Sequence, residues 1–226
     1  MDDRMFMLIG FIVGLGPTFG LLWAVMSRYE SRIAERDTNA SFVIGIFAGL
    51  LIIVGHLLFI VYYSFSSVGL VSAFGLALAE CLLYYIYLNR RKLKKRSDKP
   101  FLGLGFSLGA ASMYIAFLMG QLFLNIDFHW GHILGMVVYA FGASTIRGSM
   151  GILMARSNVR KGMFKNLLMG TLILGFFNLA TIVYLNPFET FFWVFSIPPV
   201  LMGLATFYYF IQDLEKVEKW DAESNR

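Results

Sequence analysis

Seven apolar stretches, each long enough to cross a lipid bilayer, occupy almost the whole of this 226-residue chain. About 20 consecutive apolar residues are enough to span the hydrocarbon core as a helix. The sequence therefore predicts an all-α fold, a polytopic membrane protein built as a bundle of seven transmembrane helices. The predicted helices lie at residues 5–27, 41–63, 67–89, 101–125, 131–155, 165–185 and 190–212.

The composition agrees with a membrane protein and not with a soluble one. Hydrophobic residues make up 58% of the chain and charged residues 15%, whereas a soluble domain has roughly 25% charged residues. Seven spans with short loops use up the length, so we expect residues 1–226 to form a single membrane domain. The chain starts with the acidic residues Asp2 and Asp3 and has no cleavage site after its first apolar stretch, so the first helix is expected to be retained. The one cysteine, Cys81, rules out an internal disulfide framework.

The basic residues fall on alternate connections between the spans. Of the 19 Lys and Arg residues, all but Arg4 and Arg147 lie on one side, and residues 90–99 form the densest run. Short loops rich in Lys and Arg remain in the cytosol. This predicts an N-terminus outside and a C-terminus inside, in the plasma membrane. We expect the basic run to lie at the lipid headgroups rather than to bind nucleic acid.

Glycine pairs recur at the four-residue spacing typical of packed transmembrane helices. In lipid, close approach of two backbones stabilises helix association because there is no difference in hydrophobicity to drive it. The pairs either pack neighbouring helices of one bundle or present a face to the transmembrane helix of a partner. They are Gly10 with Gly14, Gly16 with Gly20, Gly105 with Gly109, and Gly131 with Gly135.

Two charged residues, Glu80 and Arg147, lie inside predicted spans. Each is about 14–15 Å, measured along its helix, from a basic residue at the cytoplasmic end. We hypothesise that they form an ion pair, because isolated charges are costly at this depth. The alternative is that Arg147 reaches toward the headgroups and Glu80 is protonated. Asn178 and Tyr114 fall near mid-membrane, where they could join a polar network around Glu80, or make ordinary contacts between helices.

Familiar intramembrane chemistries lack their residues here. The spans contain no aspartate for an aspartyl protease, and no lysine lies deeper in a span than its first residue, so none is placed for a retinal Schiff base. His56 and His132 both fall toward the outer ends of their spans, away from Glu80, so a serine protease or a zinc site with three protein ligands is not predicted. The sequence predicts no catalytic residues, no metal and no cofactor.

Several segments, taken in order, resemble a superfamily of intramembrane proteins. They are Gly14 to Leu21, Phe74 to Tyr85 with the basic loop that follows, Gly103 to Gly109, and Tyr184 to Glu189. Similar features occur in the PrsW-type intramembrane metalloproteases and in the related APH (anterior pharynx defective) subunit of γ-secretase. The last segment and the seven-span topology are most similar to the APH subunit.

The metal-binding residues that this resemblance implies are mostly replaced. Ala79-Glu80 stands where the proteases have two glutamates, and Tyr114-Ile115 stands where they have a glutamate and an asparagine. Phe141 and Asn178 align with their histidines. One ligand of four therefore remains, which is too few for zinc. Arg147 would supply the positive charge that the metal supplies in the proteases.

The resemblance thus implies a non-catalytic scaffold, or pseudoprotease, that binds transmembrane segments of another integral membrane protein, such as a presenilin-like aspartyl protease. One alternative is an active PrsW-type metalloprotease with a rearranged site. A second is a small transporter or channel, which would need a continuous polar path through the membrane.

Overall fold

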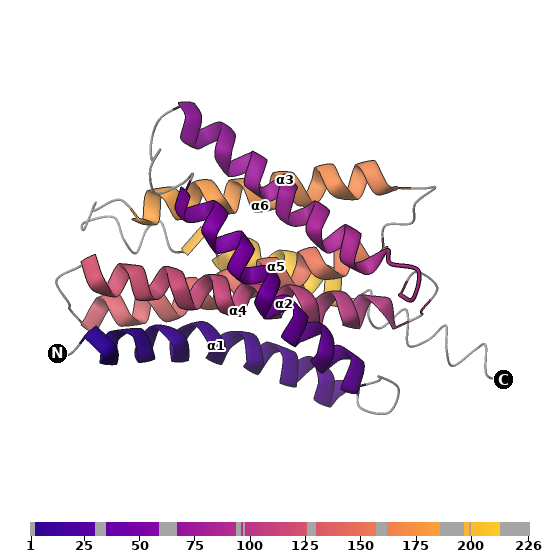
Figure 1. Ribbon diagram of the computed structural model, residues 1–226, viewed down its shortest axis with the longest axis horizontal. Helices are drawn as coiled ribbons and strands as arrows, with labels where there is room; N and C mark the ends of the chain where they lie inside the picture. Colours follow the sequence, from indigo (N-terminus) through magenta and orange to yellow (C-terminus); the bar gives the residue numbers. More distant parts are fainter. Residues whose placement is uncertain are drawn as a thin grey trace.

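The structure, a computed structural model, is a bundle of long helices (Figure 1). It describes residues 3–29, 35–58, 67–93, 96, 98–125, 130–156, 162–185, 197–198 and 200–212. The long helices are α1 (Asp3–Arg28), α2 (Glu35–His56), α3 (Ser67–Leu88), α4 (Lys99–Asn125), α5 (Trp130–Arg156) and α6 (Met163–Leu185). A shorter apolar helix, Val200–Gln212, follows and is here called the C-terminal helix.

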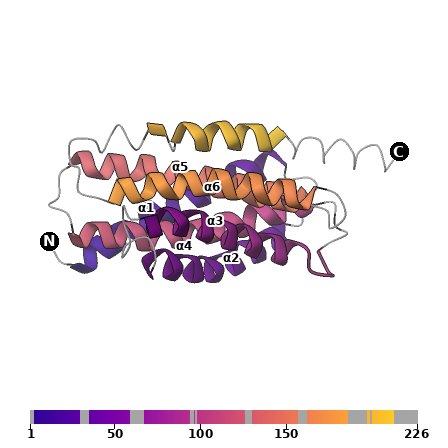
Figure 2. The same ribbon diagram turned by 90° about the horizontal axis from the view of Figure 1, so that it is seen from above.

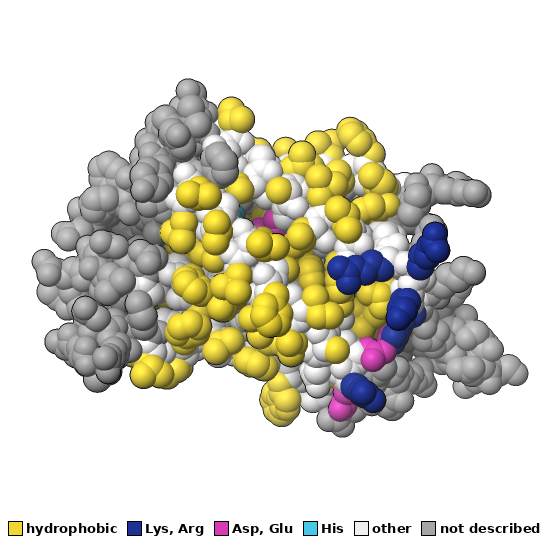
Figure 3. Space-filling view, viewed as in Figure 1, with side chains coloured by type: hydrophobic (Ala, Val, Ile, Leu, Met, Phe, Trp, Pro, Cys, Tyr) yellow, Lys and Arg dark blue, Asp and Glu magenta, His cyan; other side chains and the backbone are white. Residues whose placement is uncertain are grey.

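All six long helices are long and apolar enough to cross a membrane. Large apolar side chains cover the outside of the bundle (Figure 3), and Trp23, Leu51 and Phe164 are each at least 70% exposed. Such a surface is stable against lipid tails and not against water. The prediction of an all-helical, multi-pass integral membrane protein is therefore confirmed.

Two helices, α4 and α5, form the interior of the bundle. In their apolar stretches 89% and 83% of the residues are buried, against at most 39% in the other four spans. α4 packs against α1, α2 and α5, while α3 packs mainly against α6. Figure 2 shows the C-terminal helix at the edge of the bundle, alongside α5 and α6. The molecule therefore consists of a group centred on α4 and a pair, α3–α6, attached to it.

Most predicted boundaries lie within two residues of the observed ones, but α2 differs. It begins at Glu35 rather than at residue 41. Glu35 and Asp37 stand in its first turn, where negative charge interacts favourably with the helix dipole, although hydropathy places them outside the span. The prediction that this helix continues to residue 63 falls partly on residues 59–63, outside the described residues.

The predicted seventh span, 190–212, is described over residues 197–198 and 200–212. The part seen as the C-terminal helix is apolar but too short to cross a bilayer by itself. Seven crossings therefore stay a prediction, and six are supported by length and composition.

Glycines of α4 and its neighbours lie where helices touch backbone to backbone. A methyl group added to Gly109 would lie 2.0 Å from the carbonyl oxygen of Phe42 in α2, and one on Gly105 would lie 2.7 Å from that of Thr38. On the other side of α4, a methyl on Gly14 would lie 2.5 Å from the amide nitrogen of Ala116. A methyl group added to Gly10 would lie 3.0 Å from the backbone nitrogen of Gly120 in α4. These four glycines pack helices of the same bundle.

The pair Gly16 and Gly20 differs from the others. Both are exposed on α1, and no described atom lies within 4 Å of a methyl group added to either. They do not pack a neighbouring helix of the described bundle, because the opposite face of α1 is the one that meets α4. Of the remaining pair, Gly135 is buried in α5, and the surroundings of Gly131 are outside the described residues.

Apart from the buried Arg147, the basic side chains visible in Figure 3 gather at one end of the bundle. There Arg96 donates hydrogen bonds to Asp98 in the connection before α4 and to Asp37 at the start of α2. These hydrogen bonds, which the carboxylates of Asp98 and Asp37 accept, raise the pKa of Arg96 above its ordinary value. α1 starts at the opposite end, and the C-terminal helix ends at the basic end (Figures 1 and 2).

The glycine contacts predict a contrast between two alanine substitutions. Gly109→Ala places a methyl group against backbone atoms that no rotamer change can move, so we expect a loss of stability of about 1–3 kcal/mol or more. Gly16→Ala, the matched control on an open face, should change stability by less than about 1 kcal/mol. Unfolding of the purified variants in mixed detergent micelles measures both. Equal losses would mean that α2 and α4 do not meet at Gly109.

Candidate functional site

A buried ion pair joins α3 to α5. The Nε atom of Arg147 donates a hydrogen bond to Oε1 of Glu80 over 3.0 Å, and the two side chains are 0% and 1% exposed. The structure thus brings together the two charged residues that the sequence placed at equal depth. Each charge compensates the other, which is the usual condition for burying either.

The close packing of α5 explains the complete burial of Arg147. The next residue, Gly148, lets Leu104 of α4 and Phe207 of the C-terminal helix approach to 3.2–3.3 Å of where a methyl would be. One turn later, Gly151 meets the backbone of Gly103 in α4. With small residues on the sides that face α4 and the C-terminal helix, α5 is enclosed, and Arg147 extends from it into the interior.

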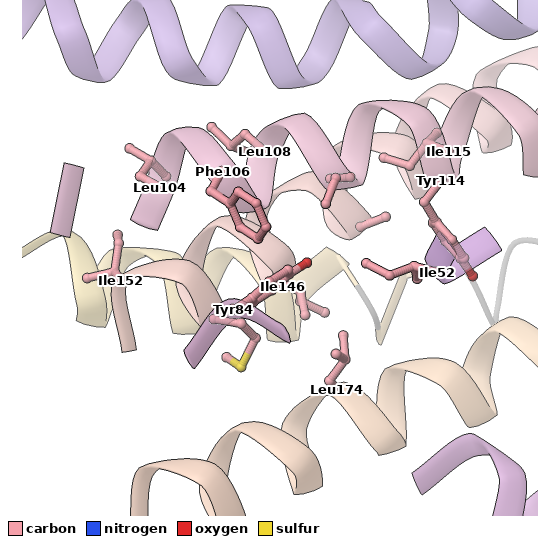
Figure 4. Close-up of a cluster of buried hydrophobic side chains, with 14 of the residues drawn as sticks. Ile52, Tyr84, Leu104, Phe106, Leu108, Tyr114, Ile115, Ile146, Ile152 and Leu174 are labelled. Atoms are coloured by element: carbon pink, nitrogen blue, oxygen red, sulfur yellow. The ribbon is translucent and has the colours of Figure 1, made fainter. Parts of the chain in front are cut away.

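Aromatic side chains surround the pair. The Tyr84 hydroxyl donates a second hydrogen bond to Oε1 of Glu80. The guanidinium carbon of Arg147 lies 3.8 Å from the centre of the Tyr114 ring and 5.5 Å from that of Phe177. A desolvated cation–π contact of this kind contributes about 2 kcal/mol. Buried apolar side chains, Ile52, Ile146 and Leu174 among them, belong to the same cluster as the two tyrosines (Figure 4).

His56 belongs to this cluster, which the sequence analysis missed. Its Nδ1 atom lies 3.3 Å from the Tyr114 hydroxyl, and the two rings meet edge to face at 4.8 Å. If the helices were parallel, the position of His56 along its span would place it near the outer surface, away from Glu80. α2 crosses α4 obliquely (Figure 1), so its last residue reaches Tyr114 in the interior. A lone histidine at a helix end carries no signal in the sequence that would predict this contact.

Asn178 is buried but has a different partner from the one expected. Its side-chain nitrogen donates a hydrogen bond to the backbone carbonyl of Ala73 over 3.1 Å, which links α6 to α3. Among the described residues, no hydrogen bond joins Asn178 to Glu80. Tyr114, the other residue expected in the network, lies directly against Arg147.

Several buried polar atoms of the cluster have no hydrogen-bond partner among the described residues. They are Nη1 and Nη2 of Arg147, Oε2 of Glu80 and Nε2 of His56. Each such group costs about 1–3 kcal/mol, and more when it is charged. The pair is therefore only partly satisfied by the protein around it.

A zinc ion does not fit the residues around Glu80. In the described part of the chain no three His, Cys, Asp or Glu side chains come together, and a catalytic zinc needs three protein ligands. The Arg147 guanidinium also occupies the position beside the carboxylate where a metal would bind, and it would repel a dication. The geometry around Glu80 is that of a buried charge pair.

Comparison with known proteins finds no matching family model, no matching curated protein and no matching solved structure. The resemblance to PrsW-type proteases and the APH subunit therefore stays a prediction from the sequence.

The ion pair predicts a strong energetic coupling between α3 and α5. Glu80→Gln and Arg147→Gln should each cost about 3–5 kcal/mol, because each leaves one uncompensated buried charge. The double variant should be more stable than the sum of the two losses predicts, by about 1 kcal/mol or more. Unfolding in mixed micelles gives the three values.

The exposed ion pair between Arg96 and Asp37, at the basic end of the bundle, is the control for this double-mutant cycle. Asp37→Asn removes a partner of Arg96 where both side chains are at least 32% exposed, so it should cost at most about 1 kcal/mol. Strictly additive losses for Glu80 and Arg147 would contradict the pair.

Proposed function

We propose that this chain is a non-catalytic membrane scaffold, or pseudoprotease, that binds a transmembrane helix of another integral membrane protein in the plasma membrane. The observation that carries the proposal is the outward face of α1. There Gly16, Gly20 and Ala24 are exposed at four-residue spacing, while the other described glycine pairs are used inside the bundle.

This face has the shape that favours helix association in lipid. Residues spaced by four lie on one side of a helix, so Gly16, Gly20 and Ala24 form a shallow groove along α1. Phe19 and Trp23 lie beside the groove and are 50% and 74% exposed. A partner helix could approach the backbone closely at the glycines and pack against the two aromatic rings.

The proposed orientation has the N-terminus outside, the C-terminus in the cytosol and seven crossings. It is supported by the basic side chains at one end of the bundle (Figure 3), because short Lys- and Arg-rich loops stay in the cytosol. α1 starts at one end of the bundle, and the C-terminal helix ends toward the other (Figures 1 and 2). This arrangement agrees with an odd number of crossings.

The resemblance to the APH subunit makes a presenilin-like aspartyl protease one candidate partner. An active PrsW-type metalloprotease is the alternative function, and the donor set around Glu80 does not support it. Here the role of the ion pair is structural: it holds α3 against α5 in the way that a shared metal would hold two helices.

The scaffold function predicts a site-specific crosslink in native membranes. A photoreactive phenylalanine in place of Trp23 should form an adduct with another membrane protein, because Trp23 borders the groove. Gly16→Leu or Gly20→Leu in the same chain should abolish the adduct, because the leucine keeps the two backbones apart. Immunoblotting and mass spectrometry of the adduct provide the measurement.

The matched control is Ile86, which is 63% exposed. Like Trp23 in α1, it lies near the C-terminal end of its helix, α3. Replacing Ile86 by the photoreactive residue should give lipid adducts only. Equal protein adducts at both positions, or an adduct of the chain with itself, would contradict the proposed partner.

A separate prediction addresses the protease alternative. Elemental analysis of the detergent-purified chain should find far less than one zinc per chain, and Glu80→Gln should not change the value. Stoichiometric zinc that is lost on Glu80→Gln would contradict the pseudoprotease and favour the metalloprotease.

A further inference from the structure

The partly satisfied ion pair carries an inference independent of the scaffold function. A guanidinium has five N–H donors, and in Arg147 only the Nε donor has a hydrogen-bond partner among the described residues. On the other side, Oε2 of Glu80 has no described donor. The pair thus presents unmet donors and an unmet acceptor together, in two side chains that are at least 98% buried.

These unmet atoms lie close together because of their covalent structure. Oε2 shares its carbon with Oε1, and Nη1 and Nη2 share theirs with Nε, so all lie two bonds from the 3.0 Å contact. The guanidinium plane is fixed by the Tyr114 ring, 3.8 Å away. A planar head with one acceptor and one donor could therefore bond to both side chains at once.

Charge selects the chemistry of that head. Arg147 and Glu80 together are neutral, so an added anion would bring an uncompensated charge into a low-dielectric interior. A carboxylic acid avoids this cost, because its carbonyl oxygen accepts from Nη of Arg147 and its O–H donates to Oε2 of Glu80. The fork of a guanidinium matches the planar geometry of a carboxyl group.

The surface shows where such a molecule would enter. Figure 3 shows acidic and histidine atoms at the floor of a hollow between apolar side chains, in the region between α2 and α3 of Figure 1. Glu80 is 2% exposed and His56 is 3% exposed. The hollow opens on the apolar outer surface of the bundle (Figure 3).

We propose that the Glu80–Arg147 pair is a binding site for the carboxylic acid head of a membrane amphiphile, a long-chain fatty acid, which enters between α2 and α3. The acyl chain remains among the apolar side chains of the hollow and the lipid. No bond is made or broken. Binding satisfies the polar atoms that the protein leaves unmet.

The test uses the purified full chain in nanodiscs and oleic acid labelled with ¹³C at its carboxyl carbon. We expect saturable binding, with a carboxyl resonance distinct from that of oleic acid in protein-free nanodiscs. Methyl oleate, which has the same chain but no acid O–H, should compete at least tenfold more weakly. Acetic acid, the water-soluble source of the same head, should also compete at least tenfold more weakly.

The variant that tests the pair is Arg147→Lys, which keeps the charge but loses the fork. It should bind oleic acid at least tenfold more weakly than the unmodified chain, and Arg96→Lys, the same change at the exposed pair, should bind as the unmodified chain does. Equal competition by methyl oleate, equal competition by acetic acid, or unchanged binding by Arg147→Lys would each overturn the proposal. The competition experiments use the unmodified chain, so they decide the question even if Arg147→Lys does not fold.

Discussion

Close contact between helix backbones around α4 is the constraint on which the rest of the structure depends. Lipid tails are as apolar as leucine side chains, so burying an apolar side chain between two membrane helices adds little stability. Van der Waals contact must supply it instead, and small residues make that contact closest. α4 has Gly105 and Gly109 against α2 and Gly103 against α5, while Gly14 of α1 lies against α4. Three helices therefore pack around one.

The pair α3–α6 is attached to this group by polar contacts, in addition to the close approach of Gly170 in α6 to Met154 in α5. Arg147 of α5 binds Glu80 of α3, and the Tyr139 hydroxyl of α5 lies 2.5 Å from the Thr181 hydroxyl of α6. The Ser41 hydroxyl of α2 lies 2.8 Å from that of Tyr87 in α3. Hydrogen bonds between membrane helices are directional, so they fix the position of α3–α6 where the fit of surfaces alone does not.

These two kinds of contact have different consequences for function. A glycine contact is complete when the backbones touch, and it leaves nothing for a ligand to bind. The ion pair is incomplete, because an arginine has more donors than Glu80 and the surrounding tyrosines accept. The outward face of α1 is incomplete in another sense, since Gly16 and Gly20 have the spacing of a helix contact but no described helix packs against them. The unmet donors and the open glycine face are where a ligand and a partner would add stability.

The sequence by itself determined the helical membrane fold, the approximate limits of most spans and the equal depth of Glu80 and Arg147. These follow from hydropathy and from rise per residue, which are properties of single helices. It also identified the glycine pairs, but not that Gly10 and Gly14 face α4 while Gly16 and Gly20 face outward. Neighbouring positions on one helix point in different directions, and only the placement of the helices decides which direction is inside. The contact of His56 with Tyr114 likewise required the tertiary structure, because it depends on the oblique crossing of α2 over α4, and a crossing angle is a property of two helices together.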